Sequence, residues 1–246
     1  MKTHIFLIFL LLNSLPSVSQ TDKEIILKDF SSIYSGKIIQ KTVVEEDTET
    51  NVEVVILDKK TNKKIFSAFA FFSDYDLEEG QAKTNIHEIP YGEQSILIYE
   101  DFNFDNVKDL AIRVGNFSCY GGPAYDVYLA KNNNFEPSES LTELAQSFCG
   151  FFSVDHEKKQ LSTMTKSGCC WHQYNTYIVE NDQPVLTEST EVGLAASGLF
   201  VDYSISKLEN GKLITKSYQE LSADIHKPLF EMTFKNGKKM VLIQGY

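Results

Sequence analysis

The sequence has 246 residues and a formal net charge of −11, and 42% of its residues are hydrophobic. It contains a single arginine, Arg113, and no basic stripe, which excludes a nucleic-acid binder that must neutralise phosphates. The hydrophobic and aromatic content is sufficient to bury a core. The acidic balance favours solubility and a cationic partner.

The first predicted element is a signal peptide at residues 1–19. Ile5–Leu12 is an unbroken apolar run, long enough for a signal-peptide core and too short to span a bilayer. The small residues Ser17 and Ser19 stand at positions −3 and −1 of a cleavage site. No later segment has the roughly 18 apolar residues of a membrane helix. We therefore expect a periplasmic or secreted protein without membrane insertion, folded as a single all-β domain over residues 20–246.

Apolar and polar residues alternate with a period of two along most of the remaining chain. The alternating runs lie at residues 51–57, 64–72, 95–99, 110–114, 125–130, 148–154, 160–165, 172–179, 200–208, 212–218, 230–234 and 240–243. Asn210-Gly211 and Asn236-Gly237 indicate hairpins, and helical patterning is confined to residues 22–34 and 141–147. The pattern predicts an antiparallel sandwich or a small propeller-like fold with one or two short helices.

Residues 101–109 read DFNFDNVKD and match the D-x-[DN]-x-D pattern of a calcium loop. Carboxylates at this spacing repel one another unless a cation lies between them. The predicted Ca²⁺ ligands are Asp101, Asn103, Asp105, the backbone carbonyl of Val107, and Asp109 either directly or through water. The alternative is an Asx-rich strand connection that holds no metal.

Two departures separate this loop from a helix–loop–helix EF-hand. Position six, usually glycine, is Asn106, which is the best non-glycine residue for left-handed backbone. Position twelve, usually a bidentate glutamate, is Ile112. The sequence therefore predicts a shorter calcium loop between strands, with a dissociation constant on the order of 10⁻⁴ to 10⁻⁶ M. Its role would be to fix the loop rather than to catalyse a reaction.

Four cysteines are present, and in an exported protein an even number suggests disulfides. Adjacent residues meet disulfide geometry only with strain, so a bond between Cys169 and Cys170 is the least expected pairing. We expect Cys119 and Cys149 to pair with Cys169 and Cys170, in an order that the sequence leaves open.

The calcium loop stands within a longer pattern. The run 99–112 is followed by Tyr120-Gly121-Gly122, the strand YDVYL at residues 125–129, and Phe135. Over about residues 94–140, this pattern resembles bacterial periplasmic calcium-binding proteins related to inhibitors of invertebrate-type lysozyme. Some members of that group are immunity proteins against type IV-secreted peptidoglycan hydrolases. The resemblance implies an all-β fold, no catalytic activity and a lysozyme-like hydrolase as protein partner.

In inhibitors of this kind, a loop of small residues with a nearby tyrosine enters the cleft of the enzyme. The resemblance implies segment 118–125 for that role. Glycines allow close approach of the backbone, and tyrosines supply rigid contact area. The predicted partner-binding residues are Ser118, Tyr120, Gly121, Gly122 and Tyr125. The alternative is a tight turn held by a disulfide at Cys119.

Two other patterns are weaker. Cys169, Cys170 and His172 have the residue types of a metal site or a Cys–His nucleophile, but disulfide formation removes the thiols. His156-Glu157 begins like a zinc-protease helix, yet the second histidine is absent. We therefore expect no enzyme activity, although 34 acidic residues leave open a glycosidase-like carboxylate pair.

The sequence thus predicts an exported calcium-binding inhibitor of a lysozyme-like peptidoglycan hydrolase. The alternative function is a cell-surface module that binds glycan or cell wall without inhibiting an enzyme. Trp171, Tyr174 and Tyr177 would form its carbohydrate platform, but alternating aromatic residues on a strand more often belong to a core.

Overall fold

Antiparallel strands follow one another along nearly all of the chain that the structure describes. The computed structural model describes residues 22–27, 29–40, 49–73, 82–88, 92–222, 228–233, 237 and 239–243. In chain order the elements are β1 (Lys23–Leu27), β2 (Tyr34–Gln40), β3 (Glu49–Asp58), β4 (Lys64–Ser73), β5 (Leu97–Glu100), β6 (Asp109–Ser118), the 3-10 turn η2 (Cys119–Gly121), β7 (Gly122–Lys131), β8 (Asn134–Pro137), α1 (Glu139–Ser147), β9 (Ser153–Asp155), β10 (Gln160–Ser167), β11 (Trp171–Glu180), β12 (Gln183–Leu194), β13 (Phe200–Glu209), β14 (Lys212–Leu221), β15 (Pro228–Thr233) and β16 (Lys239–Ile243).

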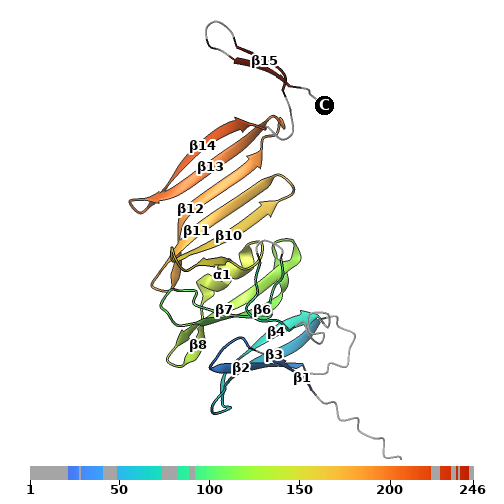
Figure 1. The fold of residues 1–246 in the computed structure, drawn as a ribbon, viewed down its shortest axis with the longest axis vertical. Helices are drawn as coiled ribbons and strands as arrows, with labels where there is room; N and C mark the ends of the chain where they lie inside the picture. Colours follow the sequence, from blue (N-terminus) through green and yellow to red (C-terminus); the bar gives the residue numbers. More distant parts are fainter. Residues whose placement is uncertain are drawn as a thin grey trace, which may run out of the picture.

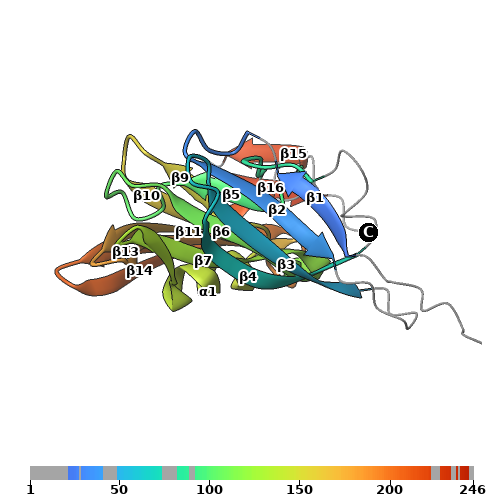
Figure 2. The same ribbon diagram turned by 90° about the horizontal axis from the view of Figure 1, so that it is seen from below.

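These strands form sheets of neighbours in sequence: β1–β4, β5–β8, β9–β14 and the pair β15–β16. The sheets follow one another along the long axis of the molecule (Figure 1). Viewed along that axis, they lie one behind another (Figure 2). None of the described sheets closes into a barrel, because each strand order runs from one edge strand to another. The expected all-β antiparallel fold is confirmed.

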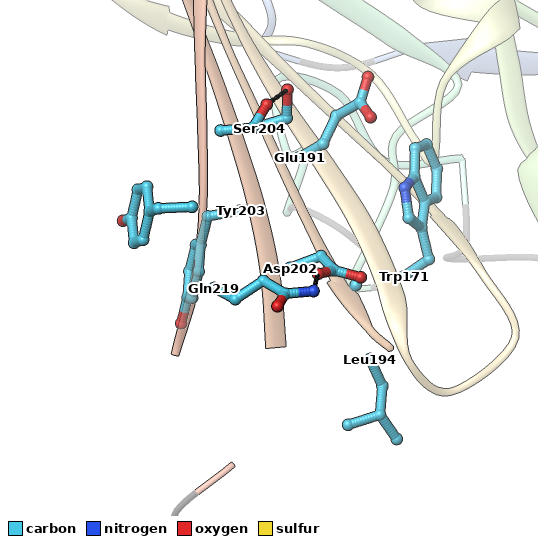
Figure 3. A pocket seen from close by; sticks show the side chains of 10 residues that line it. Trp171, Glu191, Leu194, Asp202, Tyr203, Ser204 and Gln219 are labelled. Atoms are coloured by element: carbon cyan, nitrogen blue, oxygen red, sulfur yellow. Dashed lines mark hydrogen bonds between the residues drawn. The ribbon is translucent and has the colours of Figure 1, made fainter. Parts of the chain in front are cut away.

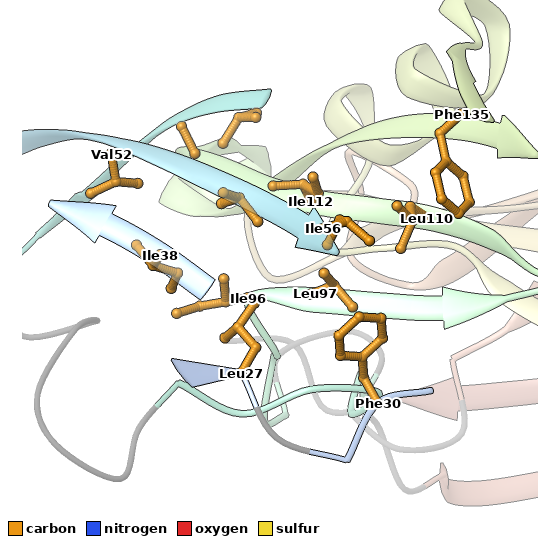
Figure 4. Close-up of a cluster of buried hydrophobic side chains, with 13 residues drawn as sticks. Leu27, Phe30, Ile38, Val52, Ile56, Ile96, Leu97, Leu110, Ile112 and Phe135 are labelled. Atoms are coloured by element: carbon orange, nitrogen blue, oxygen red, sulfur yellow. The ribbon is translucent and has the colours of Figure 1, made fainter. Parts of the chain in front are cut away.

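The middle sheet, β5–β8, is buried on both faces. In β6, Leu110 and Ile112 pack with Val54 and Ile56 of β3 in a first core, between the middle sheet and the sheet β1–β4 (Figure 4). Ala111 lies between them in sequence and belongs to a second core on the opposite face. Successive side chains of a strand point to opposite faces. Two-sided burial therefore explains why this strand reads as a nearly continuous apolar run.

The second core lies between the middle sheet, α1 and the inner strands of the sheet β9–β14. Its members include Tyr125 of β7, Phe102, Phe151, Leu161 of β10 and Tyr177 of β11. From α1 it receives three residues at helical i, i+3 and i+4 spacing, namely Leu141, Leu144 and Ala145. Full burial of a leucine or phenylalanine side chain contributes about 1.5–3 kcal/mol to the stability of the fold. This core joins the middle sheet to the sheet β9–β14.

One of the two helix predictions is confirmed and the other is wrong. The predicted helix at residues 141–147 is confirmed by α1. The helix at 22–34 is wrong, because Lys23–Leu27 pairs with β2 as an antiparallel strand. Among the described residues, no helix is long and apolar enough to cross a membrane. The predicted signal peptide lies outside the described residues.

Candidate functional site

The acidic loop connects β5 to β6 at the middle sheet. Asn106 adopts a left-handed backbone with φ 70°, as expected from its place at the sharp turn of the pattern. Phe104 also has a positive φ, 63°, which the sequence did not indicate. Its ring lies edge-on to His156, with centroids 5.9 Å apart. The loop is therefore tightly curved at two positions.

Side-chain oxygens turn inward onto the backbone of this loop. The carboxylate of Asp101 accepts hydrogen bonds from the backbone N–H of Asp105 at 3.2 Å and of Asn106 at 2.9 Å. The carboxylate of Asp105 accepts one from the N–H of Val107 at 2.7 Å, and Asn103 Oδ1 accepts one from the N–H of Asp105 at 3.3 Å. Three of the predicted ligands thus converge on the same turn. Each carboxylate has about four lone-pair sites, so these bonds leave acceptor capacity.

A second set of contacts fixes the loop to the turn between β11 and β12. Asn103 Nδ2 donates to Asp182 Oδ1 at 2.8 Å. The other oxygen of Asp182 accepts a hydrogen bond from Lys131 Nζ at 2.7 Å. Lys131 and then Asn103 lower the pKa of Asp182, so it carries its charge at neutral pH. The loop is therefore attached to the neighbouring sheet as well as to its own strands.

Asp109 has a different environment from the other predicted ligands. Its side chain is fully buried, and its oxygens accept hydrogen bonds from the backbone N–H of Phe102 and of Ala130, both at 2.8 Å. Burial raises its pKa to about 7, the two hydrogen bonds oppose this, and the charges of Asp105 and Asp101 add to it. Asp109 therefore links the loop to β7. In the part of the chain that the structure describes, no three His, Cys, Asp or Glu side chains form a metal-binding group.

The tip of the β6–β7 hairpin forms a separate exposed site. Tyr120, in η2, is 64% exposed and has φ 57°, and Gly121 follows with φ 72°. The phenol oxygen of Tyr120 accepts a hydrogen bond from the backbone N–H of Gly168 at 2.6 Å. Lys166 Nζ lies 5.1 Å from the centre of the Tyr120 ring, within cation–π range. These contacts hold the ring in one place at the surface.

Both disulfides lie at this end of the structure, but their pairing differs from the expected one. Cys119 of the tip bonds to Cys149, which follows α1, and the N–H of Cys119 donates to the carbonyl of Phe148 at 3.4 Å. Cys169 bonds to its neighbour Cys170. The expected pairing is wrong because Cys169 and Cys170 lie together in the exposed β10–β11 turn, whereas the hairpin tip already adjoins Cys149.

Only part of the predicted partner-binding segment reaches the surface. Gly121 is exposed and Gly122 partly so, alongside Tyr120. The prediction that Tyr125 contacts a partner is wrong, because the ring is fully buried and its hydroxyl donates to the carbonyl of Ser95 at 2.5 Å. Ser118 is also buried, at 5% exposure. Tyr125 is one of the alternate residues of β7 whose side chains point into the core. The interpretation of segment 118–125 as a single surface loop overlooked this alternation.

Sequence reasoning also missed an exposed aromatic residue. Phe117, near the end of β6, is 60% exposed. Its ring lies against Gly115, where a Cβ would come within 2.9 Å of it. The signal was present in the sequence, since Phe117 is a large apolar residue beyond the buried half of its strand. With Tyr120, it gives the hairpin tip two exposed aromatic rings.

The carbohydrate platform of Trp171, Tyr174 and Tyr177 does not form. Tyr177 is buried in the second core, and Tyr174 points to the opposite face of β11 from the other two. The Cys–His site is also excluded, because both cysteines are in a disulfide. His156 is in a turn, where its Nε2 lies 2.8 Å from Glu100 Oε1. Trp171 does line a separate open groove across β11–β14 (Figure 3).

Comparison with known proteins gives a likeness of fold. No family model matches the chain, and no curated protein matches it in sequence. Among solved structures, it is similar to a type IV secretion system related protein from Xanthomonas, with a TM-score of 0.62 and 20% identity. The match covers 79% of this chain and 93% of that one. At this identity the likeness shows a shared fold.

Proposed function

We propose that this protein is an exported calcium-binding protein that binds and inhibits a lysozyme-like peptidoglycan hydrolase. The observation that carries the proposal is the β6–β7 tip, where Tyr120 is exposed while its backbone and hydroxyl are both held. The hairpin tip presents small residues beside the ring, so it can enter a concave active site. Inhibition then results from occupying the cleft, without any chemical step.

Pre-organisation is the physical reason for choosing the tip. A loop that is already ordered loses little conformational entropy on binding, and this loss is a large part of the cost of association. The Cys119–Cys149 bond and the hydrogen bond from Gly168 both restrict the tip before any partner arrives. Tyrosine has only two rotatable side-chain bonds, and its ring is a frequent centre of binding energy.

The setting of the protein is consistent with such a partner. Its fold is shared with a protein related to a type IV secretion system, which supports a role associated with secretion and with protein interaction. The net charge of −11 favours association with a cationic enzyme. Disulfides are expected in an oxidising compartment outside the cytoplasm, which supports an exported protein.

Calcium would be held by the side chains of Asp101, Asn103 and Asp105 with the carbonyl of Val107. These side chains fit a hard cation, because their oxygens already converge on one turn and are acceptors only. A bound ion would neutralise the carboxylates of Asp101 and Asp105. Asp109 would contribute by anchoring the loop to β7, and its predicted role as a ligand remains a proposal.

The proposal is tested by following the clearing of a bacterial cell-wall suspension. The oxidised exported protein, with calcium, is assayed alone and then with a panel of lysozymes and peptidoglycan hydrolases. We expect no clearing by the protein alone and a dose-dependent slowing of at least one hydrolase, with a matching complex on size-exclusion chromatography. Clearing by the protein alone, or no complex with any member of the panel, would contradict the proposal.

A further inference from the structure

The open groove on the sheet β9–β14 is separate from the hairpin tip and has its own chemistry. The register of β11, β12, β13 and β14 places Trp171, Gly193, Asp202 and Gln219 side by side in one row across the sheet. Glu191, Ser204 and Ser217 form the next row on the same face. Together they line a depression of about 460 Å³ that is open to solvent (Figure 3).

Trp171 owes its place to the glycine opposite it. A Cβ built on Gly193 would lie 3.2 Å from Cδ1 of the Trp171 ring, so the absence of a side chain allows the indole to approach the strand. Trp171 is only partly buried, and it is the single tryptophan of the chain. The groove thus has the indole ring at its edge, next to the polar side chains of the two rows.

The polar side chains of the groove are already oriented by their neighbours. Asp202 Oδ1 accepts a hydrogen bond from Gln219 Nε2 at 2.6 Å. Glu191 Oε1 accepts one from Gln173 Nε2 at 3.0 Å. Ser204 and Ser217 share a hydrogen bond of 3.3 Å between their hydroxyls. Each carboxylate keeps further lone pairs, so the groove offers ordered acceptors beside an aromatic ring.

We propose that this groove binds a neutral glycan. The apolar C–H face of a pyranose ring would lie against the indole of Trp171, and the sugar hydroxyls would donate to Asp202 and Glu191. Among the described residues that line the groove, none is lysine, arginine or histidine. Two carboxylates without a cation disfavour an acidic glycan through repulsion. Leu194, Tyr203 and Tyr218 also line the groove. Its ordered carboxylates and hydroxyls nevertheless favour a polyhydroxylated ligand over a peptide, which needs a largely apolar centre.

The single tryptophan supplies a direct measurement. Fluorescence of the oxidised full protein is titrated with hexasaccharides of N-acetylglucosamine, glucose in β-1,4 linkage and glucose in α-1,4 linkage. An acidic oligogalacturonate and a lysine hexapeptide are the comparison ligands. We expect saturable change in the Trp171 emission with at least one neutral hexasaccharide, and at least tenfold weaker binding of the oligogalacturonate. Response to the peptide alone, or to none of the neutral sugars, would overturn the proposal.

Variants assign the binding to the groove. Trp171→Ala and the pair Asp202→Asn/Glu191→Gln are each expected to weaken binding at least tenfold by calorimetry. The matched control is Tyr174→Ala, which removes an exposed aromatic side chain from the opposite face of the same strand and should leave affinity unchanged. Equal losses in Tyr174→Ala would contradict the assignment. Circular dichroism establishes that each variant is folded, and no hydrolase is needed, so the result is independent of the inhibitor proposal.

Discussion

The hydroxyl oxygen of Tyr120 accepts a hydrogen bond from the backbone N–H of Gly168, 48 residues further along the chain. This bond joins the β6–β7 tip to the β10–β11 turn, and each of these two segments carries a disulfide. The tip belongs to the middle sheet and the turn to the next one. Tyr120 therefore connects two sheets while most of its ring faces solvent.

Tyr120 should carry much of the inhibition. Tyr120→Ala removes the exposed ring, and we expect the inhibition constant for the target hydrolase to rise at least tenfold, the usual loss at a central aromatic contact. Tyr120→Phe keeps the ring but loses the hydrogen bond from Gly168, so its inhibition should lie between that of the unchanged protein and that of Tyr120→Ala. The control is Tyr218→Ala, which removes an exposed tyrosine from β14. An unchanged inhibition constant in Tyr120→Ala would exclude the tip as the binding site.

Calcium should stabilise the fold through the acidic loop. At a calcium concentration one hundred times the dissociation constant, the free energy of unfolding should rise by about 2.7 kcal/mol. Asp101→Asn/Asp105→Asn should weaken binding at least tenfold in calorimetry and abolish the stabilisation. Asp155→Asn is the control, because Asp155 is an acid at the end of β9 whose carboxylate accepts a hydrogen bond from the N–H of Lys158 at 2.9 Å. A melting temperature unaffected by calcium or chelator would count against the site.

Tyr125 should behave as a core residue. Tyr125→Phe leaves the buried carbonyl of Ser95 without the hydroxyl that donates to it, so we expect a loss of about 1–3 kcal/mol in the free energy of unfolding. Hydrolase inhibition should be unchanged at temperatures where the variant is folded. Urea unfolding measures the first quantity, and the clearing assay measures the second. Tyr218→Phe, at an exposed site, should have no effect on either.

The two disulfides should differ greatly in their contribution to stability. Cys119 and Cys149 are 30 residues apart, so their bond restricts the unfolded chain and contributes roughly 3–4 kcal/mol. Cys169 and Cys170 are adjacent, and their bond closes no loop of comparable length. Urea unfolding of Cys119→Ser/Cys149→Ser and Cys169→Ser/Cys170→Ser makes the comparison. Similar losses in the two double variants would contradict this account.

His87 should make the fold less stable in mild acid. Burial lowers the pKa of its imidazole, and the charge of Glu100 opposes this to a smaller extent. A lowered folded-state pKa means that the unfolded chain takes up the proton first, near pH 6.5, and stability falls as pH decreases below that value. The slope from this residue cannot exceed about 1.4 kcal/mol per pH unit. His87→Gln should flatten the profile between pH 7 and 5, measured by urea unfolding.

Local patterns in the sequence predict much of the fold. The alternation in β3, β7 and β13 and the left-handed backbone at Asn106 follow from period and residue type alone. The helix α1 follows from Leu141, Leu144 and Ala145, which have helical spacing. These features depend on interactions between residues that are close in the chain, so they are visible in a linear reading.

Features that depend on contacts between distant segments were not predictable. Alternation groups Tyr125 with Val127 and Leu129 on one face of β7, but this face is the inward one only because α1 and the sheet β9–β14 cover it. The pairing of Cys119 with Cys149 depends on α1 returning the chain to the hairpin tip. Likewise, the groove at Trp171 requires the register of four strands, which the sequence does not specify.

In the described chain, each sheet is built from consecutive strands, and this has a consequence for the order of assembly. Nearly all pairing is local in sequence, so a chain emerging N-terminus first can complete β1–β4 before β5 appears. That sheet would then present Val54 and Ile56 uncovered until the middle sheet arrives to bury them. Until the middle sheet is complete at β8, this uncovered apolar surface makes the nascent chain prone to aggregation. A chaperone is therefore most useful at that stage.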